Sequence, residues 1–485
     1  MNTKLIFSFF ILVFFGTGCK KFLDTKPISS EIEETFYTNT AEVESGVLGC
    51  YAALRDVYNN DPILAGLRSD DCYVSQSEGD INLIDGFGEL PTNSYVSLYW
   101  QTSYFTIKQC NTVLKYINNV SDPAERDYFE GEARFIRAHM YFNLVRLFGD
   151  VPLIVNSVAY NDANFYRRVG KDTIYQQVIS DFAIAQQKLP ASWTATQLGR
   201  VTKYSAAGML AKVYLTLKDY PSSRALLLDL LQNSGPHRLL PDYRNVFGVS
   251  NEMNAEVMYA VRFKSNSNGL GNDFTYFMDN LPGSPGFKAA SDFRGNTPFS
   301  NADSIRKLQT FLTGGPVYGN SYYAGGKYQD PGSQKYDGGA DFIVLRYADI
   351  IMMYAEVVNE MDGANPLTIA DATDPLSRLY QLNRIRSRAA GQVPAAVPVY
   401  GFSDTTVNSQ DNFRATIKAE RRREFGIESQ RWHDLVRWGD AVAVMNNHFI
   451  LRRISVTVEP YQLLYPIPQR EIDVSRNILT QNPGY

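Results

Sequence analysis

The sequence has few of the side chains that carry most metal binding and catalysis. It contains four cysteines and four histidines in 485 residues. No Cys-x-x-Cys pair, His-Glu-x-x-His motif or P-loop is present, and the histidines are scattered along the chain. Adjacent acids such as Asp70 and Asp71 do not show the separation across a cleft that a glycosidase needs. We therefore expect a protein that is not an enzyme, with no catalytic residue, cofactor or metal site.

Positive charge and long hydrophobic runs are also scarce. With 47 Lys and Arg against 51 Asp and Glu, the net charge is −4. Nucleic-acid recognition depends on neutralising phosphates, so this balance argues against a nucleic-acid partner. The first apolar run, Leu5–Phe15, is interrupted only by Ser8 and is too short to span a bilayer. No later run is long enough to cross a membrane.

The first residues have the pattern of an export signal. Lys4 supplies a positive start, the apolar run follows, and Gly16-Thr17-Gly18 precede Cys19. Small residues directly before a cysteine resemble a bacterial lipobox, in which the cysteine sulfur receives a lipid. We expect residues 1–18 to be a lipoprotein signal peptide, Cys19 to be the lipid attachment site and residues 19–40 to form the lipidated tether. The alternative is an ordinary secretory peptide cut near the same place.

Three further cysteines, Cys50, Cys72 and Cys110, would then lie in an oxidising compartment. Their number is odd, so at most one disulfide joins two of them. The sequence leaves two outcomes open, one disulfide or a fully buried set of free thiols.

Aromatic residues, by contrast, are abundant. The chain has 31 tyrosines, 28 phenylalanines and 4 tryptophans, together 13% of its residues. Tyrosine beyond the needs of a core tends to lie on surfaces that contact a ligand. A sugar ring stacks on an aromatic face while its hydroxyls bond to polar side chains, and a peptide can use the same kind of surface.

Two stretches without helical period, residues 61–92 and 251–341, are rich in Gly, Ser and Asn and also carry Tyr and Phe. Such stretches are either disordered or functional surfaces, and their aromatic content favours folded loops. We expect ligand contacts in and beside them. The candidates are Asp70, Asp71, Tyr73, Asn82, Tyr95, Trp100, Phe293, Arg294, Tyr318, Tyr322 and Tyr323. The alternative for each is core packing or loop stabilisation, above all for Trp100, which lies on an expected helix.

The helical run at residues 132–148 organises the rest of the chain. Its apolar side chains recur at helical spacing, namely Phe135, Ala138, Tyr141, Phe142, Val145 and Phe148. Gly149 can close the helix and Pro152 prevents its continuation. Arg134 and Arg137 partly share the apolar side, so we expect them either to pair with acids from elsewhere or to lie along aromatic faces.

The same reasoning predicts the other elements. Apolar spacing indicates helices over residues 41–58, 95–117, 173–189, 203–217, 225–231, 342–356, 382–389, 417–425 and 428–439. Residues 256–263 have the pattern of a strand. Acids and arginines alternate with apolar residues between 420 and 437, which predicts a layer of paired charges beneath the core.

Several segments resemble one family of proteins. Residues 132–153 read Glu-x-Arg-x-x-Arg-Ala-x-x-Tyr-Phe-x-Leu-Val-x-x-Phe-Gly-Asp-Val-Pro-Leu, and residues 199–215 read Gly-Arg-Val-Thr-Lys-Tyr-x-Ala-Ala-x-x-Leu-Ala-x-Val-Tyr-Leu. The chain ends with Leu-Tyr-Pro-Ile-Pro at 464–468 and Gln-Asn-Pro-Gly-Tyr at 481–485. These segments are similar, in the same order, to the signatures of the SusD/RagB family of outer-membrane nutrient-binding lipoproteins.

The resemblance implies a mainly α fold, with tetratricopeptide-like helix pairs as scaffold, an irregular loop-rich lobe and few short strands. It implies an N-terminal helical region at 41–250, a ligand-facing lobe at 251–341 and a C-terminal helical region at 342–485. It further implies a lipid-anchored, surface-exposed protein of the outer membrane that binds oligosaccharides and delivers them to a SusC-like, TonB-dependent transporter. The alternatives are a peptide-binding, RagB-like lipoprotein and a scaffold that only seals the transporter.

Overall fold

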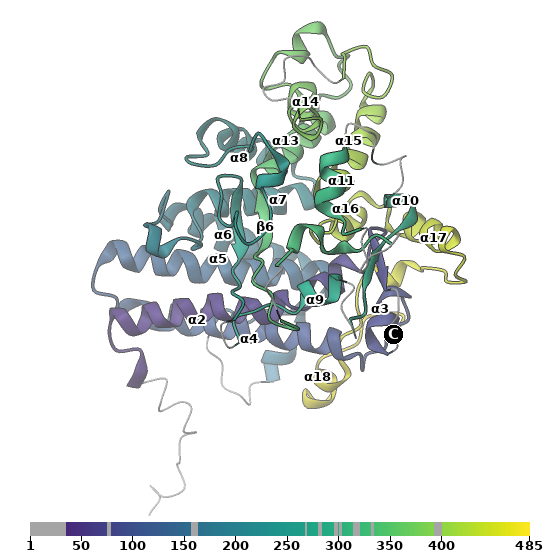
Figure 1. Cartoon of the computed structure of the whole chain (residues 1–485). Coiled ribbons are helices and arrows are strands. Elements are labelled where there is room, and N and C mark those ends of the chain that lie inside the picture. Colours follow the sequence, from purple (N-terminus) through teal and green to yellow (C-terminus); the bar gives the residue numbers. More distant parts are fainter. Residues whose placement is uncertain are drawn as a thin grey trace, which may run out of the picture.

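The protein is a stack of antiparallel helices that carries a lobe of short elements on one side (Figure 1). The computed structural model describes residues 35–74, 79–156, 163–266, 269–279, 284–294, 299, 303–313, 321–330, 334–391 and 400–485. The N-terminal half of the stack consists of α2 (Thr40–Tyr58), α4 (Ser94–Tyr116), α5 (Pro123–Phe148), α6 (Lys171–Lys188), α7 (Lys203–Thr216) and α8 (Tyr220–Asn233). Each of these helices packs on the next in this order. The mainly α fold expected from the sequence is confirmed.

The predicted organising helix is the centre of this stack. Asp122 caps the start of α5 by accepting hydrogen bonds from two backbone amides of the first turn, and Gly149, at φ 74°, ends it. Arg134 and Arg137 both reach Asp181 of α6, at 3.0 and 2.8 Å. The first of the two expected outcomes, pairing with an acid from elsewhere, is therefore confirmed.

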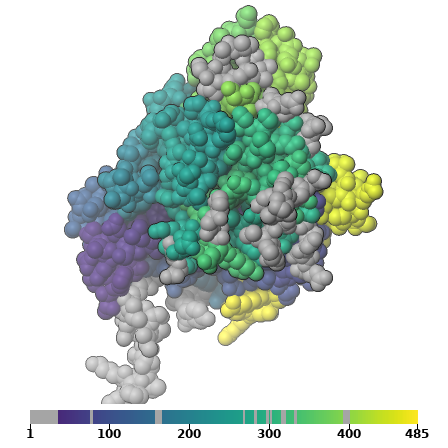
Figure 2. Space-filling model, viewed as in Figure 1, coloured from purple at the N-terminus to yellow at the C-terminus, as the bar shows by residue number. Residues whose placement is uncertain are grey.

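The stack continues across the middle of the chain. Helix α13 (Tyr347–Asp362) packs on α8, and α14 (Arg378–Ala389) and α15 (Gln410–Phe425) pack on α13. Gly208 of α7 lets this layer close up, because a Cβ there would lie 2.6 Å from Leu345 Cδ2. The C-terminal elements α16 (Arg431–Trp438), α17 (Ala441–Arg452) and α18 (Gln469–Val474) follow, and α17 stands out at one edge of the molecule (Figures 1 and 2).

Three two-stranded antiparallel sheets complete the described elements. They pair β1 (Cys72–Val74) with β5 (Phe287–Ala289), β2 (Val151–Pro152) with β3 (Arg168–Val169), and β4 (Val257–Val261) with β6 (Phe342–Arg346). Strand β4 confirms the predicted strand. The prediction of a helix from residue 342 is wrong for its first five residues, which form β6. Both faces of β6 are buried, and a short apolar run of this kind has no period that separates strand from helix.

The two stretches expected to be irregular meet in space. The first contains the short helical turn η2 (Pro62–Gly66), strand β1 and α3 (Asp80–Asp85). The second contains α9 (Phe274–Met278), β5, α10 (Ser291–Arg294), α11 (Ser304–Thr310) and η8 (Ala324–Tyr328). In the β1–β5 ladder Tyr73 lies opposite Lys288, so the first stretch forms one lobe with the second.

The predicted layer of paired charges is present and buried. Glu424 of α15 bonds to Arg346 at 2.6 Å, to Arg306 at 3.1 Å and to Arg388. Glu420, one turn earlier, bonds to Arg306 at 2.7 Å. These groups join α15 to α11, α14 and β6 within the core.

The C-terminal tail closes back onto the end of α5. The backbone amide of Tyr465 donates to Leu147 O at 2.8 Å, and Asn482 Nδ2 donates to Phe148 O at 3.0 Å. These two carbonyls belong to the last turn of α5, where a helix has no internal donors left. Tyr485 OH then donates to Glu89 Oε1 at 3.0 Å, beside α3. The tail thus supplies the C-terminal cap of the organising helix.

Cys50, Cys72 and Cys110 are free and buried, so of the two outcomes left open the set of free thiols is the one found. A hydrogen bond with Cys110, followed by burial, raises the pKa of the Cys50 thiol. Among the helices of the described chain, none combines the length and the apolar character needed to cross a membrane.

Candidate ligand-binding site

The two candidate acids lie in the ionic layer. Asp70 and Asp71 are each 2% exposed. Arg431 Nε binds Asp70 Oδ1 at 2.7 Å, and Arg422 Nε binds Asp71 Oδ1 at 3.1 Å. Burial raises the pKa of Asp71 to about 6, whereas Arg422 and Arg431 outweigh burial at Asp70 and hold its pKa well below the usual range. A ligand reaches these carboxylates only by displacing the arginines.

Three aromatic candidates are parts of the core. Trp100 packs against Phe148 with ring centroids 5.1 Å apart, and Phe293 packs against Phe311 at 5.2 Å. Tyr323 is also buried, in a bridge with Leu312. These placements match the alternative of core packing that the sequence left open.

Four other candidates are accessible at separate places. Tyr73 lies under the guanidinium of Arg452, 4.5 Å from its ring centre, and Asn82 is exposed on α3. Tyr322 is half-buried, with Arg294 5.3 Å from its ring centre. Cys19 and Tyr318 lie outside the described residues. The contact of each of these side chains with a ligand stays a prediction.

The last candidate, Tyr95, belongs to a cluster of aromatic side chains, of which Tyr336 is exposed at the surface of the lobe. Tyr95 lies in the first turn of α4 and is half-buried. Burial raises the pKa of Tyr95, and so do its neighbours Tyr336, Asp80 and Asp273. Tyr336 is 46% exposed, and its ring centre lies 4.7 Å from that of Tyr276 in an edge-to-face arrangement. We call Tyr95, Tyr276, Phe277, Tyr336 and Lys335 the aromatic platform.

The backbone fixes the exposed end of this platform. Gln334 and Asp337 form a bridge across a two-residue turn, and Tyr336 at its tip has φ 60°, a value that side-chain-bearing residues rarely adopt. Next to the turn, Gly338 pairs with Asn272 through hydrogen bonds of 2.7 and 3.0 Å. A Cβ on Gly338 would lie 2.6 Å from Asn272 Oδ1, so a larger residue would force the two bridged segments apart.

Lys335 adds a cation to the platform. Its Nζ lies 4.8 Å from the ring centres of both Tyr276 and Tyr336, and hydrogen bonds to these two tyrosines raise the pKa of Lys335. Phe287 of β5 supports the platform, because its ring is stacked on that of Phe277 with ring centroids 6.5 Å apart. The result is one exposed tyrosine ring, backed by buried aromatic side chains and accompanied by an ammonium group, which suits a ligand with apolar ring faces and hydroxyl groups.

Sequence reasoning found Tyr95 but missed the other platform residues. The pattern Gln-Lys-Tyr-Asp-Gly-Gly at 334–339 is a turn signal with an aromatic residue at its centre. That signal points to a tyrosine presented at a loop tip, whereas Tyr323 directly precedes a helical turn and is buried.

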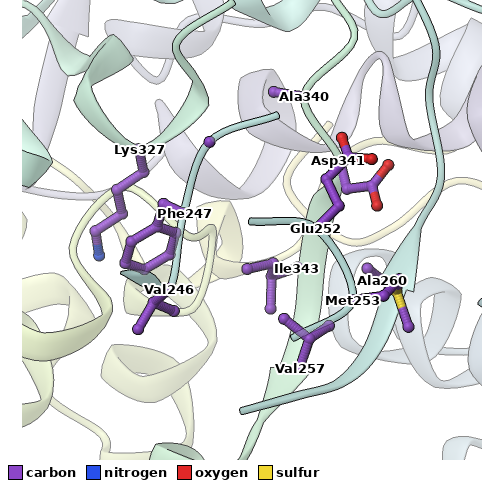
Figure 3. Close-up of a pocket in the computed structure, with 11 residues that line it drawn as sticks. Val246, Phe247, Glu252, Met253, Val257, Ala260, Lys327, Ala340, Asp341 and Ile343 are labelled. Carbon is purple, nitrogen blue, oxygen red and sulfur yellow. The ribbon is translucent and has the colours of Figure 1, made fainter. Parts of the chain in front are cut away.

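A hollow between β4, β6 and the 246–253 segment has separate acidic and basic sides (Figure 3). Lys327 points away from Asp341 and Glu252, and its Nζ bonds to Glu428 Oε1 at 2.5 Å. Burial lowers the pKa of Lys327 to about 8 and raises that of Asp341 to about 7. Asp341 is held by Arg262 at 2.5 Å and by the amide of Phe263. Lys327 and Asp341 thus each have a structural partner, and their charged groups do not point toward a common position in the hollow.

Metal-binding side chains do not gather anywhere in the described residues: no group of three or more histidine, cysteine, aspartate or glutamate side chains is placed to hold an ion.

Two family models match the chain. Residues 294–485 match the model described as the SusD family, and residues 21–215 match the model described as starch-binding and associating with the outer membrane. A SusD-like protein of Formosa agariphila, P25, is 25% identical over 100% of both chains.

Solved structures share the fold. A SusD homologue from Bacteroides thetaiotaomicron superposes with a TM-score of 0.79 at 20% identity, over 95% of this chain and 99% of that one. Surface glycan-binding protein A from the same organism, in complex with laminarihexaose, gives a TM-score of 0.74 at 20% identity, over 91% and 99% of the two chains.

Proposed function

Because the chain belongs to the SusD/RagB family, we propose that it is a glycan-binding protein of the outer membrane and that its aromatic platform holds the sugar. The platform carries the proposal. Tyr336, 46% exposed at a rigid turn, offers a ring that a pyranose can cover, and Tyr276 fixes that ring from the side. Lys335 is placed to donate hydrogen bonds to the hydroxyl groups of the same sugar.

The wider role follows from the family. We propose that Cys19 carries the lipid, that the chain faces the outside of the cell, and that it passes captured oligosaccharides to a SusC-like, TonB-dependent transporter. Binding and release are the only steps required, and no covalent chemistry enters. The complex of surface glycan-binding protein A with laminarihexaose supports an oligosaccharide as the ligand class.

The proposal is tested by calorimetric titration of the full chain with neutral oligosaccharides, starting with laminarihexaose and maltohexaose. We expect saturable binding of at least one neutral oligosaccharide. Tyr336→Ala should weaken it about tenfold or more, because an exposed aromatic anchor typically carries ~1.4 kcal/mol or more of the binding energy.

Tyr461→Ala is the matched control, since Tyr461 is also exposed, at 41%, and lies outside the platform. Equal losses in both variants would contradict the assignment of the site. If mixed peptides bind and none of the sugars does, the peptide-binding alternative is established. If neither peptides nor sugars bind, the scaffold is favoured.

A further inference from the structure

A second hollow lies between α15, α16 and α17, on elements that contribute nothing to the aromatic platform. It is open, has a volume of about 350 Å³ and falls at the lower end of the ~300–1,000 Å³ range of small-ligand sites. Helical spacing builds its walls, since Lys418 and Arg422 are one turn apart on α15, as are Ala419 and Arg423. Helix α16 contributes Arg431, Leu435 and Trp438, and α17 with its preceding residue contributes Asp440 and Val444.

The charges that face this hollow are mainly positive. Four cations line it against one acid, Asp440. The acids that balance these cations lie mostly behind the wall: Asp70, Asp71 and Glu420 are buried, while the side chains of Arg422, Arg423 and Arg431 keep 11–13% exposure. A group in the hollow therefore meets three guanidinium groups and one ion pair, because Lys418 Nζ bonds to Asp440 Oδ2 at 2.6 Å.

Arg431 shows how this wall is held. Its Nε and Nη2 atoms donate to the two oxygens of Asp70 at 2.7 and 3.0 Å. These two hydrogen bonds fix the plane of the guanidinium group, and its Nη1 makes no hydrogen bond to any described residue. Guanidinium groups with a fixed plane suit carboxylate and sulfate groups, which accept bonds in the same geometry.

One side of the hollow is aromatic and apolar. Trp438 is half-buried, and its Nε1 donates to Glu356 Oε1 at 2.8 Å, which fixes the indole against α13. Leu435 and Val444 extend the apolar surface. A ligand that fits this wall carries an acidic group next to a weakly polar ring face.

We propose that this hollow binds an acidic sugar residue of a glycan, through its carboxylate or sulfate group. The choice of a sugar rests on the proposed function, whereas the choice of an acidic group rests on the four cations. The protein would then hold its cargo at two places, a neutral segment on the aromatic platform and an acidic residue here.

The test is calorimetric titration of the full chain with trigalacturonate, with a sulfated carrageenan tetrasaccharide and with neutral galactotriose. The first two separate carboxylate from sulfate as the acidic group. We expect at least one acidic oligosaccharide to bind, galactotriose to bind at least tenfold more weakly, and the acidic affinity to fall as salt is raised.

Ala419→Glu places a negative charge, of the same sign as the acidic ligand, at the exposed edge of the hollow without changing the core. It should lower the affinity for the acidic oligosaccharide about tenfold, and Lys418→Gln should lower it in the same direction. Ala415→Glu is the matched control, because Ala415 is also exposed and lies one turn earlier on α15, outside the hollow. We expect less than a twofold change for this control.

The two proposals fail separately. Loss of neutral-glycan binding in Tyr336→Ala reports on the platform, and that variant should leave the acidic affinity unchanged. The acidic site is refuted by no binding of either acidic probe, by equal binding of galactotriose, by equal effects of Ala419→Glu and Ala415→Glu, or by loss of acidic binding in Tyr336→Ala.

Discussion

Replacing Glu424 by glutamine should lower the free energy of unfolding far more than a comparable substitution at the surface. Glu424 is fully buried and bonds to Arg306, Arg346 and Arg388. Burial alone would raise its pKa, but the three arginines outweigh burial and hold the pKa of Glu424 well below its usual range. Glutamine keeps the shape and removes the charge on which three guanidinium groups depend.

The magnitude follows from burial. Removing one partner of a buried charge network costs about 3–5 kcal/mol, because the remaining charges stay desolvated and uncompensated. Glu360→Gln is the matched control. Its partner Arg414 is a third exposed, and pairs of this kind contribute about 0–1 kcal/mol. The two variants should therefore differ by about 2–5 kcal/mol.

Urea titration followed by tryptophan fluorescence and by far-UV circular dichroism measures the difference. Midpoints compared at a common slope give the change in free energy of unfolding. The double variant Glu424→Gln, Arg388→Gln should recover part of the loss, since it removes one of the stranded charges. If Glu424→Gln falls within 1 kcal/mol of Glu360→Gln, the ionic layer does not stabilise the fold as argued.

Three further results are expected. Burial lowers the pKa of all four histidines, so below pH 6.5 the unfolded state binds protons that the folded state does not. Burial raises the pKa of Asp341 to about 7 and that of Asp61 to about 6, which offsets part of this loss; thermal stability should therefore fall as pH drops from 6.5 to 5, and a rise over this range would contradict the burial of the histidines. Gly338→Ala should weaken neutral-glycan binding by opening the platform turn, while Gly49→Ala, whose Cβ meets nothing within 4 Å, should not; calorimetry compares the two. The three buried thiols should be inert to Ellman's reagent in the native protein and all react in guanidinium chloride, whereas one reactive thiol under those conditions would indicate a disulfide.

Helix positions were predictable from the sequence because local rules decide them. The spacing of apolar residues gave α5, and Gly149 marked its end, where the structure has it at φ 74°. The charges near Glu424 could be predicted to pair because a buried charge without a partner is too costly. Local rules failed at residues 342–346, where pairing with β4, distant in the sequence, decides the conformation.

The candidate site was only partly predictable for a similar reason. Tyr95 was found because it lies near an irregular stretch, but so does Phe293, which is fully buried. Whether an aromatic residue faces outward depends on the turn that carries it, and for Tyr336 that turn is fixed by the bridge between Asn272 and Gly338. Composition predicts that a surface of this kind exists, while contacts between distant residues decide which rings form it.

The cap that the C-terminal tail places on α5 separates the order of synthesis from the order of folding. Phe148 leaves the ribosome 334 positions before Asn482, the residue whose side chain binds its carbonyl. The last carbonyl groups of α5 therefore gain their hydrogen-bond donors only after almost the whole chain has been synthesised. A chain that still lacks residues 465–482 lacks these contacts, so the last turn of α5 is completed only when those residues arrive.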